Sequence, residues 1–302
     1  MSKTFKRVIS LIMTIIMLTG LSSYAYALNS TETPSAVSYT GLKYYSFDSD
    51  NSDNDYAELA YELNNSSYST ENLIRSFGNG LTEVTNTTVL PFSAIGYLYI
   101  VTSHFPYNVA RATAYMISKN VAITAAHCVF DKSSNSCYDN VYFYPGKHGA
   151  GTTNDPFGAS YRVSGGVCND YINNTNPNLN CYYDWAVILL NDDIGNDCGT
   201  LQYSNLSYNT IRNASSILTS GYPQNTGISG LIPNYKQYKQ TFAASTIMDN
   251  YMTGTTSFLS GQSGSPVMIN NTAFGLISTT SQITLLTQSA CSYIDQFVSD
   301  NL

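Results

Sequence analysis

Three short motifs hold a histidine, an aspartate and a serine, which together can activate a hydroxyl group for attack on a carbonyl carbon. In chain order, TAAHCV contains His127, DWAVILL contains Asp184 and GQSGSPV contains Ser263. A serine hydroxyl is a poor nucleophile at neutral pH, so it needs an imidazole to take its proton and a carboxylate to orient that imidazole. The sequence therefore predicts Ser263 as nucleophile, His127 as its base and Asp184 as the orienting carboxylate.

The neighbouring residues favour these three side chains over others of the same type. His127 follows the apolar run VAITAA, whereas His104 and His148 have no such setting. Asp184 directly precedes the apolar run 185–190, where a buried carboxylate would be costly without a partner. Each residue alone has an ordinary structural alternative: a half-buried histidine, a strand-capping aspartate or a turn serine. The three in this order favour catalysis.

The chain order also separates this pattern from the nucleophile elbow of the α/β-hydrolases, G-x-S-x-G. That elbow requires glycine two residues after the nucleophile and the order serine, acid, histidine. Here position 265 is serine, and the order is histidine, aspartate, serine. The α/β-hydrolase interpretation is therefore excluded.

The elements that must position these residues are short strands. From about residue 84, short apolar runs alternate with turn residues, at 93–101, 112–117, 121–126, 141–144, 185–190, 216–222, 265–269 and 273–278. This spacing predicts an all-β sandwich or pair of barrels. Only residues 289–302 show helical spacing of apolar side chains, which predicts a short C-terminal helix.

Composition narrows the class of partner. Apolar residues make up 43% of the 302 residues and charged residues 11%, with 26 tyrosines and a net charge of −7. No basic run occurs beyond the N-terminus, so nucleic acid is not expected as a partner. The three histidines are scattered and no C-x-x-C or EF-hand pattern occurs, so we expect neither a metal nor a cofactor.

The N-terminus is typical of a bacterial export signal. Three basic residues precede an apolar run at 8–21, and Ala-Tyr-Ala follows at 25–27. The run is short for a retained membrane anchor, the alternative interpretation. We expect residues 1–27 to be removed, leaving a secreted protein with no further membrane segment.

Residues 28–83 differ in composition from the rest of the chain. They contain nine acidic residues, two basic residues and no cysteine, and 47–56 reads FDSDNSDNDY. This composition predicts a pro-segment or a flexible, solvated leader, with two possible helical turns at 56–63. We place its end between 75 and 83, with cuts after Arg75 or Glu83 as candidates, and expect 84–302 to fold as one domain.

The six cysteines fit an oxidising compartment, where disulfides form. They are Cys128, Cys137, Cys168, Cys181, Cys198 and Cys291. Six cysteines allow fifteen pairings. Proximity along the chain favours disulfides between Cys128 and Cys137 and between Cys168 and Cys181, which leaves Cys198 to pair with Cys291.

The motifs TAAHC, DWAVILL and GQSGSP resemble the three active-site motifs of chymotrypsin-like (trypsin-fold) serine proteases, and most closely those of secreted bacterial glutamyl endopeptidases. VTNTTVLPFSAIGYL at 84–98 resembles the start of that branch's mature domain. The resemblance implies two antiparallel six-stranded β-barrels with the active site between them. It also implies an oxyanion hole formed by the backbone N–H groups of Gly261 and Ser263, and glycine suits the tight turn that such a site requires.

The resemblance also implies a primary specificity pocket formed by Ser257, Phe258, Ile277, Ser278, Thr279 and Thr280. Ile277 stands where the glutamyl endopeptidases have a histidine that contributes to glutamate preference. Phe258 would narrow the pocket. Because no lining residue is charged, we expect uncharged, small or modestly apolar residues before the scissile bond.

The predicted function is that of a secreted, monomeric serine endopeptidase, made as a zymogen, that hydrolyses peptide or protein substrates through an acyl-enzyme. Gln262 stands where pancreatic enzymes have the aspartate that binds the new N-terminus, so activation should follow removal of the leader instead. The alternative is a catalytically silent homologue that binds peptides or surface partners.

Overall fold

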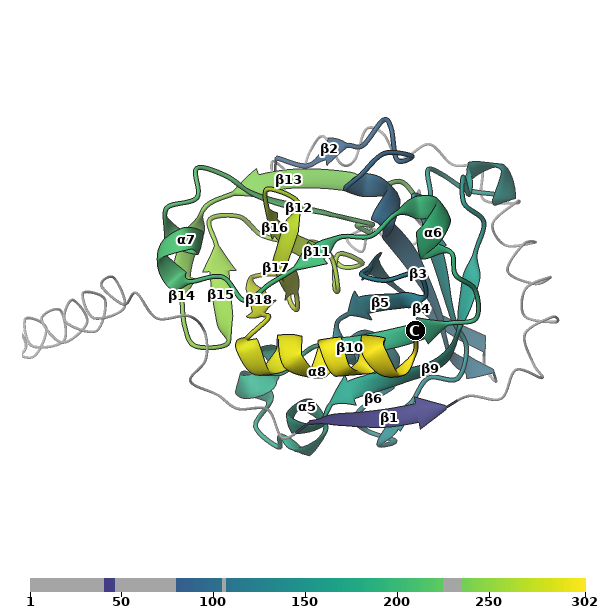
Figure 1. Cartoon of the computed structure of the whole chain (residues 1–302), viewed down its shortest axis with the longest axis horizontal. Coiled ribbons are helices and arrows are strands. Elements are labelled where there is room, and N and C mark those ends of the chain that lie inside the picture. The colour runs from purple at the N-terminus through teal and green to yellow at the C-terminus, as the bar shows by residue number, and fades with distance from the viewer. Residues whose placement is uncertain (1–40, 47–79, 105–106, 225–234) are drawn as a thin grey trace, which may run out of the picture.

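The computed structural model of the protein describes residues 41–46, 80–104, 107–224 and 235–302 (Figure 1). The predicted signal peptide, the possible helix at 56–63 and the candidate cut at Arg75 lie outside these residues. No helix in the described ranges is both long and apolar enough to span a membrane.

Six strands form a closed antiparallel barrel in the first half of the domain. They are β3 (Ile95–His104), β4 (Tyr107–Met116), β5 (Val121–Thr124), β8 (Val141–Pro145), β9 (Ser160–Cys168) and β10 (Ala186–Leu190). Their order is β9-β10-β5-β4-β3-β8, and pairing of β8 with β9 closes the ring. The first predicted six-stranded barrel is therefore confirmed.

The second half forms a curled sheet. Its strands are β2 (Thr82–Glu83), β11 (Gln202–Tyr203), β12 (Ile217–Gly221), β13 (Tyr238–Phe242), β14 (Ala244–Ile247), β15 (Tyr251–Gly254), β16 (Pro266–Ile269), β17 (Thr272–Ile277) and β18 (Gln282–Leu285). They follow the order β14-β15-β18-β17-β16-β12-β13-β2, and β11 pairs with β17. Among the described strands no pairing joins the two ends, so this half is an open half-barrel rather than a closed one.

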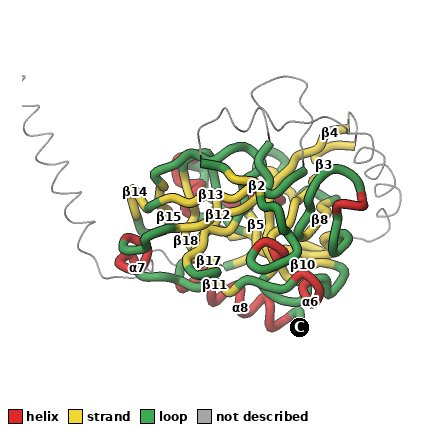
Figure 2. Tube along the Cα trace, turned by 90° about the horizontal axis from the view of Figure 1, so that it is seen from above, coloured by secondary structure: helices red, strands yellow, loops and turns green. Residues whose placement is uncertain are grey.

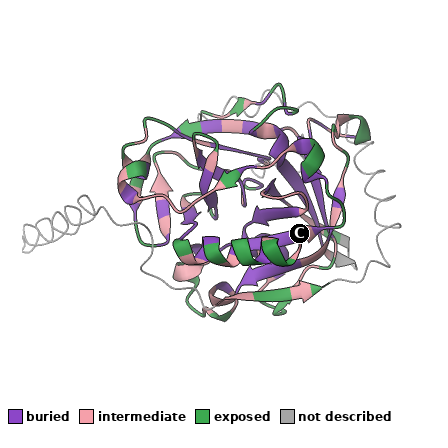
Figure 3. Ribbon diagram, viewed as in Figure 1, coloured by how far each residue is buried: buried purple, intermediate pink, exposed green. Residues whose placement is uncertain are grey.

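Helices are short, and several of them lie at the outside of the strand-built interior (Figure 2). They are α4 (Ala126–Val129), α5 (Asn169–Asn173), α6 (Gly195–Cys198), α7 (Tyr208–Arg212) and α8 (Gln288–Asp300), with the 3₁₀ turns η2 (Phe92–Ala94), η3 (Thr152–Asn154) and η4 (Pro177–Tyr182). The predicted C-terminal helix is α8. Its N-cap residue Thr287 accepts a hydrogen bond from Ala290 N, and one face of the helix is buried while the other is exposed (Figure 3).

The hydrophobic core follows the two sheets. One cluster of buried side chains fills the closed barrel and extends to α8, and a second fills the half-barrel. In β3 every residue from 95 to 101 is buried, as expected for a strand that is covered on both faces. Trp185, the single tryptophan, is fully buried beside Asp184.

The acidic leader contains a strand that the sequence analysis did not predict. Residues Leu42–Ser46 form β1, which pairs antiparallel with β9 beside the closed barrel (Figure 1). Of the two alternatives predicted for the leader, a flexible, solvated segment does not describe residues 42–46, and the pro-segment stays a prediction. The local sequence LKYYS has two adjacent tyrosines, which favour a strand, whereas the acidic composition of the whole leader hid this local preference.

The six cysteines are free thiols in the structure. Five are buried and Cys137 is half-buried on the small hairpin of β6 (Phe130–Asp131) and β7 (Ser136–Cys137). The three predicted pairings are not formed here, and they stay predictions.

Candidate active site

The pairing of β5 with β10 brings His127 and Asp184 together. Ala186 lies opposite Thr124 in an antiparallel register, so the segment after β5 and the segment before β10 meet at one end of the barrel. His127 lies in α4, three residues beyond Thr124, and Asp184 lies two residues before Ala186. Their side chains meet, with His127 Nδ1 2.7 Å from Asp184 Oδ2.

Asp184 is held by three hydrogen bonds in a buried position. Oδ1 accepts from the backbone N–H of His127 at 2.9 Å, and Oδ2 faces both His127 Nδ1 and the hydroxyl of Ser278, which donates at 2.5 Å. Burial alone would raise the pKa of the Asp184 carboxyl, but the imidazole charge and these hydrogen bonds lower it below its usual value. The carboxylate is therefore ionised at neutral pH.

His127 contacts Asp184 through one ring nitrogen and the thiol of Cys128 through the other. Its side chain is 38% exposed. Burial alone would lower the pKa of the imidazole, but the negative charge of Asp184, with smaller contributions from Cys128 and from the hydrogen bonds to both residues, raises the pKa well above the usual value. Nδ1 of the neutral ring donates to Asp184, so the lone pair of the ring is at Nε2. Nε2 lies 3.6 Å from Cys128 Sγ.

Ser263 lies on a tight turn that is tied to both halves of the domain. Its carbonyl accepts from Thr113 N in β4 at 2.9 Å, and the next residue, Gly264, donates to Ile277 O at 2.8 Å. Gly264 has φ +81°, and a methyl group there would lie 3.1 Å from Ala125 N. The serine turn therefore packs directly against the residue that caps α4, the helix that contains His127.

The structure thus brings His127 and Asp184 into contact and places the turn of Ser263 against the residue that caps α4. Within the described residues, Ser263 Oγ and His127 Nε2 form no hydrogen bond. Catalytic hydrogen bonds are often long in a protein without substrate and shorten when substrate binds. Proton transfer from Ser263 requires that Oγ and Nε2 approach each other while His127 Nδ1 keeps its contact with Asp184.

The turn also leaves two backbone donors available. Gly261 has φ +85°, and a side-chain methyl there would lie 2.3 Å from the carbonyl oxygen of Tyr222. Within the described part of the chain, neither Gly261 N nor Ser263 N donates a hydrogen bond. Only glycine fits this left-handed, crowded position, and two unused N–H groups beside a serine could bind one oxyanion.

Gln262 stabilises this turn from within. It is fully buried, and its Oε1 accepts from Leu259 N at 2.8 Å. The side chain that replaces the pancreatic aspartate therefore binds its own loop, so the loop shape does not require a charged partner.

The residues predicted for the specificity pocket occupy different environments. Phe258 N donates to Thr280 O at 2.8 Å, so the two predicted walls lie side by side. Ser257 and Thr280 are exposed, whereas Phe258 and Ile277 are buried in the half-barrel core, where the Phe258 ring packs against Phe242 at 5.5 Å. The pocket itself stays a prediction.

Ser278 has a role that the sequence analysis missed. It was predicted as a pocket residue, but its hydroxyl donates to Asp184 Oδ2. It ends the apolar run AFGLIS, and no local pattern links that run to a carboxylate 94 residues earlier. Only the packing of the two halves brings the hydroxyl to Asp184.

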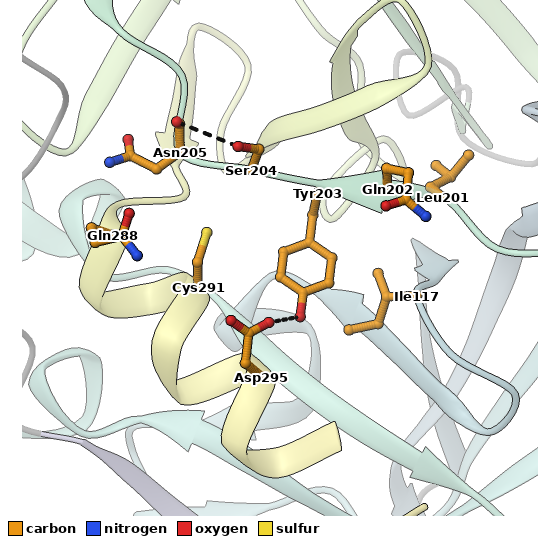
Figure 4. Close-up of a pocket in the computed structure, with 9 residues that line it drawn as sticks. All are labelled: Ile117, Leu201, Gln202, Tyr203, Ser204, Asn205, Gln288, Cys291 and Asp295. Atoms are coloured by element: carbon orange, nitrogen blue, oxygen red, sulfur yellow. Dashed lines mark hydrogen bonds between the residues drawn. The ribbon is translucent and has the colours of Figure 1, made fainter. Parts of the chain in front are cut away.

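A separate pocket lies between β11 and α8 (Figure 4). It is lined by Ile117, Leu201, Gln202, Tyr203, Ser204, Asn205, Gln288, Cys291 and Asp295. None of the predicted catalytic or oxyanion residues lines it, and the hydroxyl of Tyr203 donates to Asp295 within it. Across the described ranges no cluster of three or more histidine, cysteine, aspartate or glutamate side chains is arranged to hold a metal ion.

Comparison with known proteins identifies the family of the chain. Residues 96–293 match the family model described as Trypsin. The chain is 32% identical over 210 residues to a glutamyl endopeptidase of Bacillus licheniformis, a match that covers 66% of this chain and 55% of that protein. The chain therefore spans about half the length of this curated relative.

Two solved structures show the same fold. A Glu endopeptidase in complex with MPD superposes with a TM-score of 0.61 at 24% identity, covering 73% of this chain and 97% of that one. An inactivated protease paralogue from the scabies mite superposes with a TM-score of 0.53 at 14% identity, covering 72% and 99%. The family match over most of the domain confirms the resemblance seen in the motifs, and the chain belongs to the trypsin family of chymotrypsin-like serine proteases.

Proposed function

We propose that the protein is a secreted bacterial serine endopeptidase in which Ser263, His127 and Asp184 act as a catalytic triad. The observation that carries the proposal is the 2.7 Å contact between His127 Nδ1 and Asp184 Oδ2 beside the turn that bears Ser263. Family membership supports the class of reaction, and this contact supports the assignment of roles.

The chemistry proceeds in two halves. His127 Nε2 removes the proton of Ser263 Oγ as this oxygen attacks the scissile carbonyl carbon, and Asp184 stabilises the imidazolium that forms. The C–N bond breaks as His127 gives the proton to the leaving amine, which leaves an acyl group on Ser263. Water, deprotonated by the same imidazole, then attacks the acyl carbon, and the proton returns to Ser263 as the carboxylic acid leaves.

The N–H groups of Gly261 and Ser263 are proposed to bind the oxyanion of both tetrahedral intermediates. Their lack of acceptors within the described residues supports this role, because donors that await a charge need no reorganisation when it develops. Loss of one such donor typically costs about 10²–10³ in rate.

We propose that the residue before the scissile bond is uncharged. The predicted pocket residues carry no charge, and Ile277, which replaces the histidine of the glutamyl endopeptidases, is 1% exposed within an apolar core. A glutamate side chain would therefore enter a site without a cationic partner, which is costly.

A catalytically silent homologue is the second candidate. The scabies mite paralogue shows that the fold also occurs in a protein described as inactivated. In this chain the intact histidine–aspartate contact and the unused N–H groups argue for activity.

Cleavage of a peptide library by the purified, processed protein tests both candidates. We expect cleavage after small or modestly apolar residues, little cleavage after glutamate, and complete loss of cleavage in Ser263→Ala. The Ser265→Ala variant is the matched control and should cleave normally. Absence of cleavage by a folded, processed protein would favour the silent homologue, and strong preference for glutamate would refute the proposed pocket.

A further inference from the structure

Strand β9 has an edge that the barrel pairs only in part. One side of β9 pairs with β10 over most of its length. On the other side, β8 pairs only with Ser160 and Tyr161, at the start of the strand. The remainder, Ser164 to Cys168, pairs with β1 of the leader. Without β1 this half of the edge would expose unpaired backbone groups, which other strands can bind.

Backbone hydrogen bonds fix the register of β1. Leu42 lies opposite Cys168, and Asn169 N donates to Gly41 O at 2.9 Å. In an antiparallel ladder this pattern directs the N–H of Lys43 toward β9. Beyond the ladder, the hydroxyl of Ser164 donates to Tyr45 O at 2.7 Å.

Side chains of β1 contact three other elements. Leu42 lies against Gly166 of β9, where an added methyl group would come within 3.2 Å of it. Tyr44 stacks on Phe297 of α8, with ring centres 5.8 Å apart and planes at 6°. Tyr45 packs against Phe130, at a ring distance of 6.0 Å. The strand therefore fits a shaped surface and not only a free edge.

This surface is separate from the catalytic residues. The described contacts of β1 involve β9, α8 and Phe130 in the hairpin of β6 and β7. None of them involves His127, Asp184 or Ser263. An extended segment that adds to a sheet edge gains affinity from main-chain hydrogen bonds and specificity from alternate side chains. A segment bound here leaves the proposed substrate site open.

We propose that residues 41–46 are a docking strand through which the leader stays bound to the protease, outside the substrate site, after the chain has been cut. The strand completes the β9 edge and joins it to α8. The inference rests on the proposed removal of the leader, but not on catalysis.

The test uses the full chain with Ser263→Ala, so that the protein cannot degrade its own leader. Residues 64–70 are replaced by the recognition sequence of a site-specific protease, and the folded protein is cut there. Size-exclusion chromatography and native mass spectrometry then report whether the two pieces remain together. We expect them to co-elute at micromolar concentration, and separation of the two pieces would overturn the proposal.

Two substitutions at one position isolate the ladder. Lys43→Ala removes the side chain but keeps the N–H, whereas Lys43→Pro also removes the donor. We expect Lys43→Ala to retain the complex and Lys43→Pro to weaken it by about tenfold or more. Equal retention by both variants would contradict docking through this ladder.

A synthetic peptide of residues 40–47 provides a measurement that does not depend on the folding of a variant. Added in excess to the cut protein, it should displace the leader, and its Lys43→Pro form should not. Failure of the unmodified peptide to displace the leader would also overturn the proposal.

A final arm separates this inference from the proposed function. In the cut chain with Ser263 intact, a fluorophosphonate should label Ser263 without releasing the leader. Release on labelling would show that the leader occupies the substrate site, which contradicts the proposal. Co-elution without labelling would support the docking strand and show that a cut at 64–70 does not activate the protease, whereas the catalytic role is tested on the processed protein.

Discussion

Replacement of Asp184 by asparagine should remove most activity while leaving the fold in place. Oδ1 accepts from a backbone N–H, which can only donate, and Oδ2 faces His127 Nδ1 and the Ser278 hydroxyl. An asparagine that keeps its oxygen at the Oδ1 position must place its NH₂ group at the Oδ2 position. His127 then has to accept at Nδ1, so its proton moves to Nε2 and it cannot take the proton of Ser263.

The expected loss follows from the wrong tautomer. It is about 10⁴ in kcat, which corresponds to about 5 kcal/mol in the activation free energy. Stability should change little, because the Ser278 hydroxyl can rotate and accept from the new NH₂ group. Ser278→Ala removes one hydrogen-bond donor to the ionised Oδ2 of Asp184, so it should lower kcat about tenfold.

The assay is kcat/KM on a peptide substrate, with folding followed by the fluorescence of the single, buried Trp185. Asp197→Asn, on an exposed residue, is the matched control and should behave as wild type. An Asp184→Asn enzyme that is folded and within tenfold of wild-type activity would refute the assignment of Asp184.

Four further predictions concern the His127–Asp184 pair, Gly261 and the Lys147–Asp155 pair. Burial lowers the pKa of His127, and the charge of Asp184 raises it. NMR titration should therefore place this pKa above the usual 6.5 in the wild type and below 6.5 in Asp184→Asn. The same pKa in both proteins would contradict the coupling. The wild-type pair should add stability below pH 6.5 that is lost as the pH rises through the raised pKa. Gly261→Ala should lower kcat by at least about 10² through displacement of the oxyanion N–H, and normal kinetics would exclude that role. Lys147 and Asp155 form a buried ion pair, with side-chain exposures of 0% and 5%. Lys147→Ala leaves the carboxylate buried without its partner, so it should lower the free energy of unfolding, measured in urea, by about 3–5 kcal/mol. A loss below about 1 kcal/mol would show that the carboxylate finds another partner.

Much of the fold could be predicted because its signals are local. Runs such as 93–101 and 185–190 became buried strands, and the helical spacing at the C-terminus became α8. The open form of the second sheet could not be predicted, because closure depends on which strands meet after folding and not on their number.

The candidate site was predictable where chemistry is concentrated in short motifs. His127 and Asp184 are in contact, the turn of Ser263 packs against the residue that caps α4, and the catalytic roles of the three stay a proposal. Ser278 was missed because its contact with Asp184 joins the two halves of the domain. Strand β1 was missed because a five-residue preference is lost in the average of an acidic leader.

The most direct test of the central claim is covalent labelling of the processed protein with a fluorophosphonate, followed by peptide mapping. We expect one phosphonyl group on Ser263, with labelling abolished in Ser263→Ala and His127→Ala and retained in Ser265→Ala. Labelling at Ser265, or no labelling of a folded and processed protein, would contradict the proposal that Ser263 is the nucleophile.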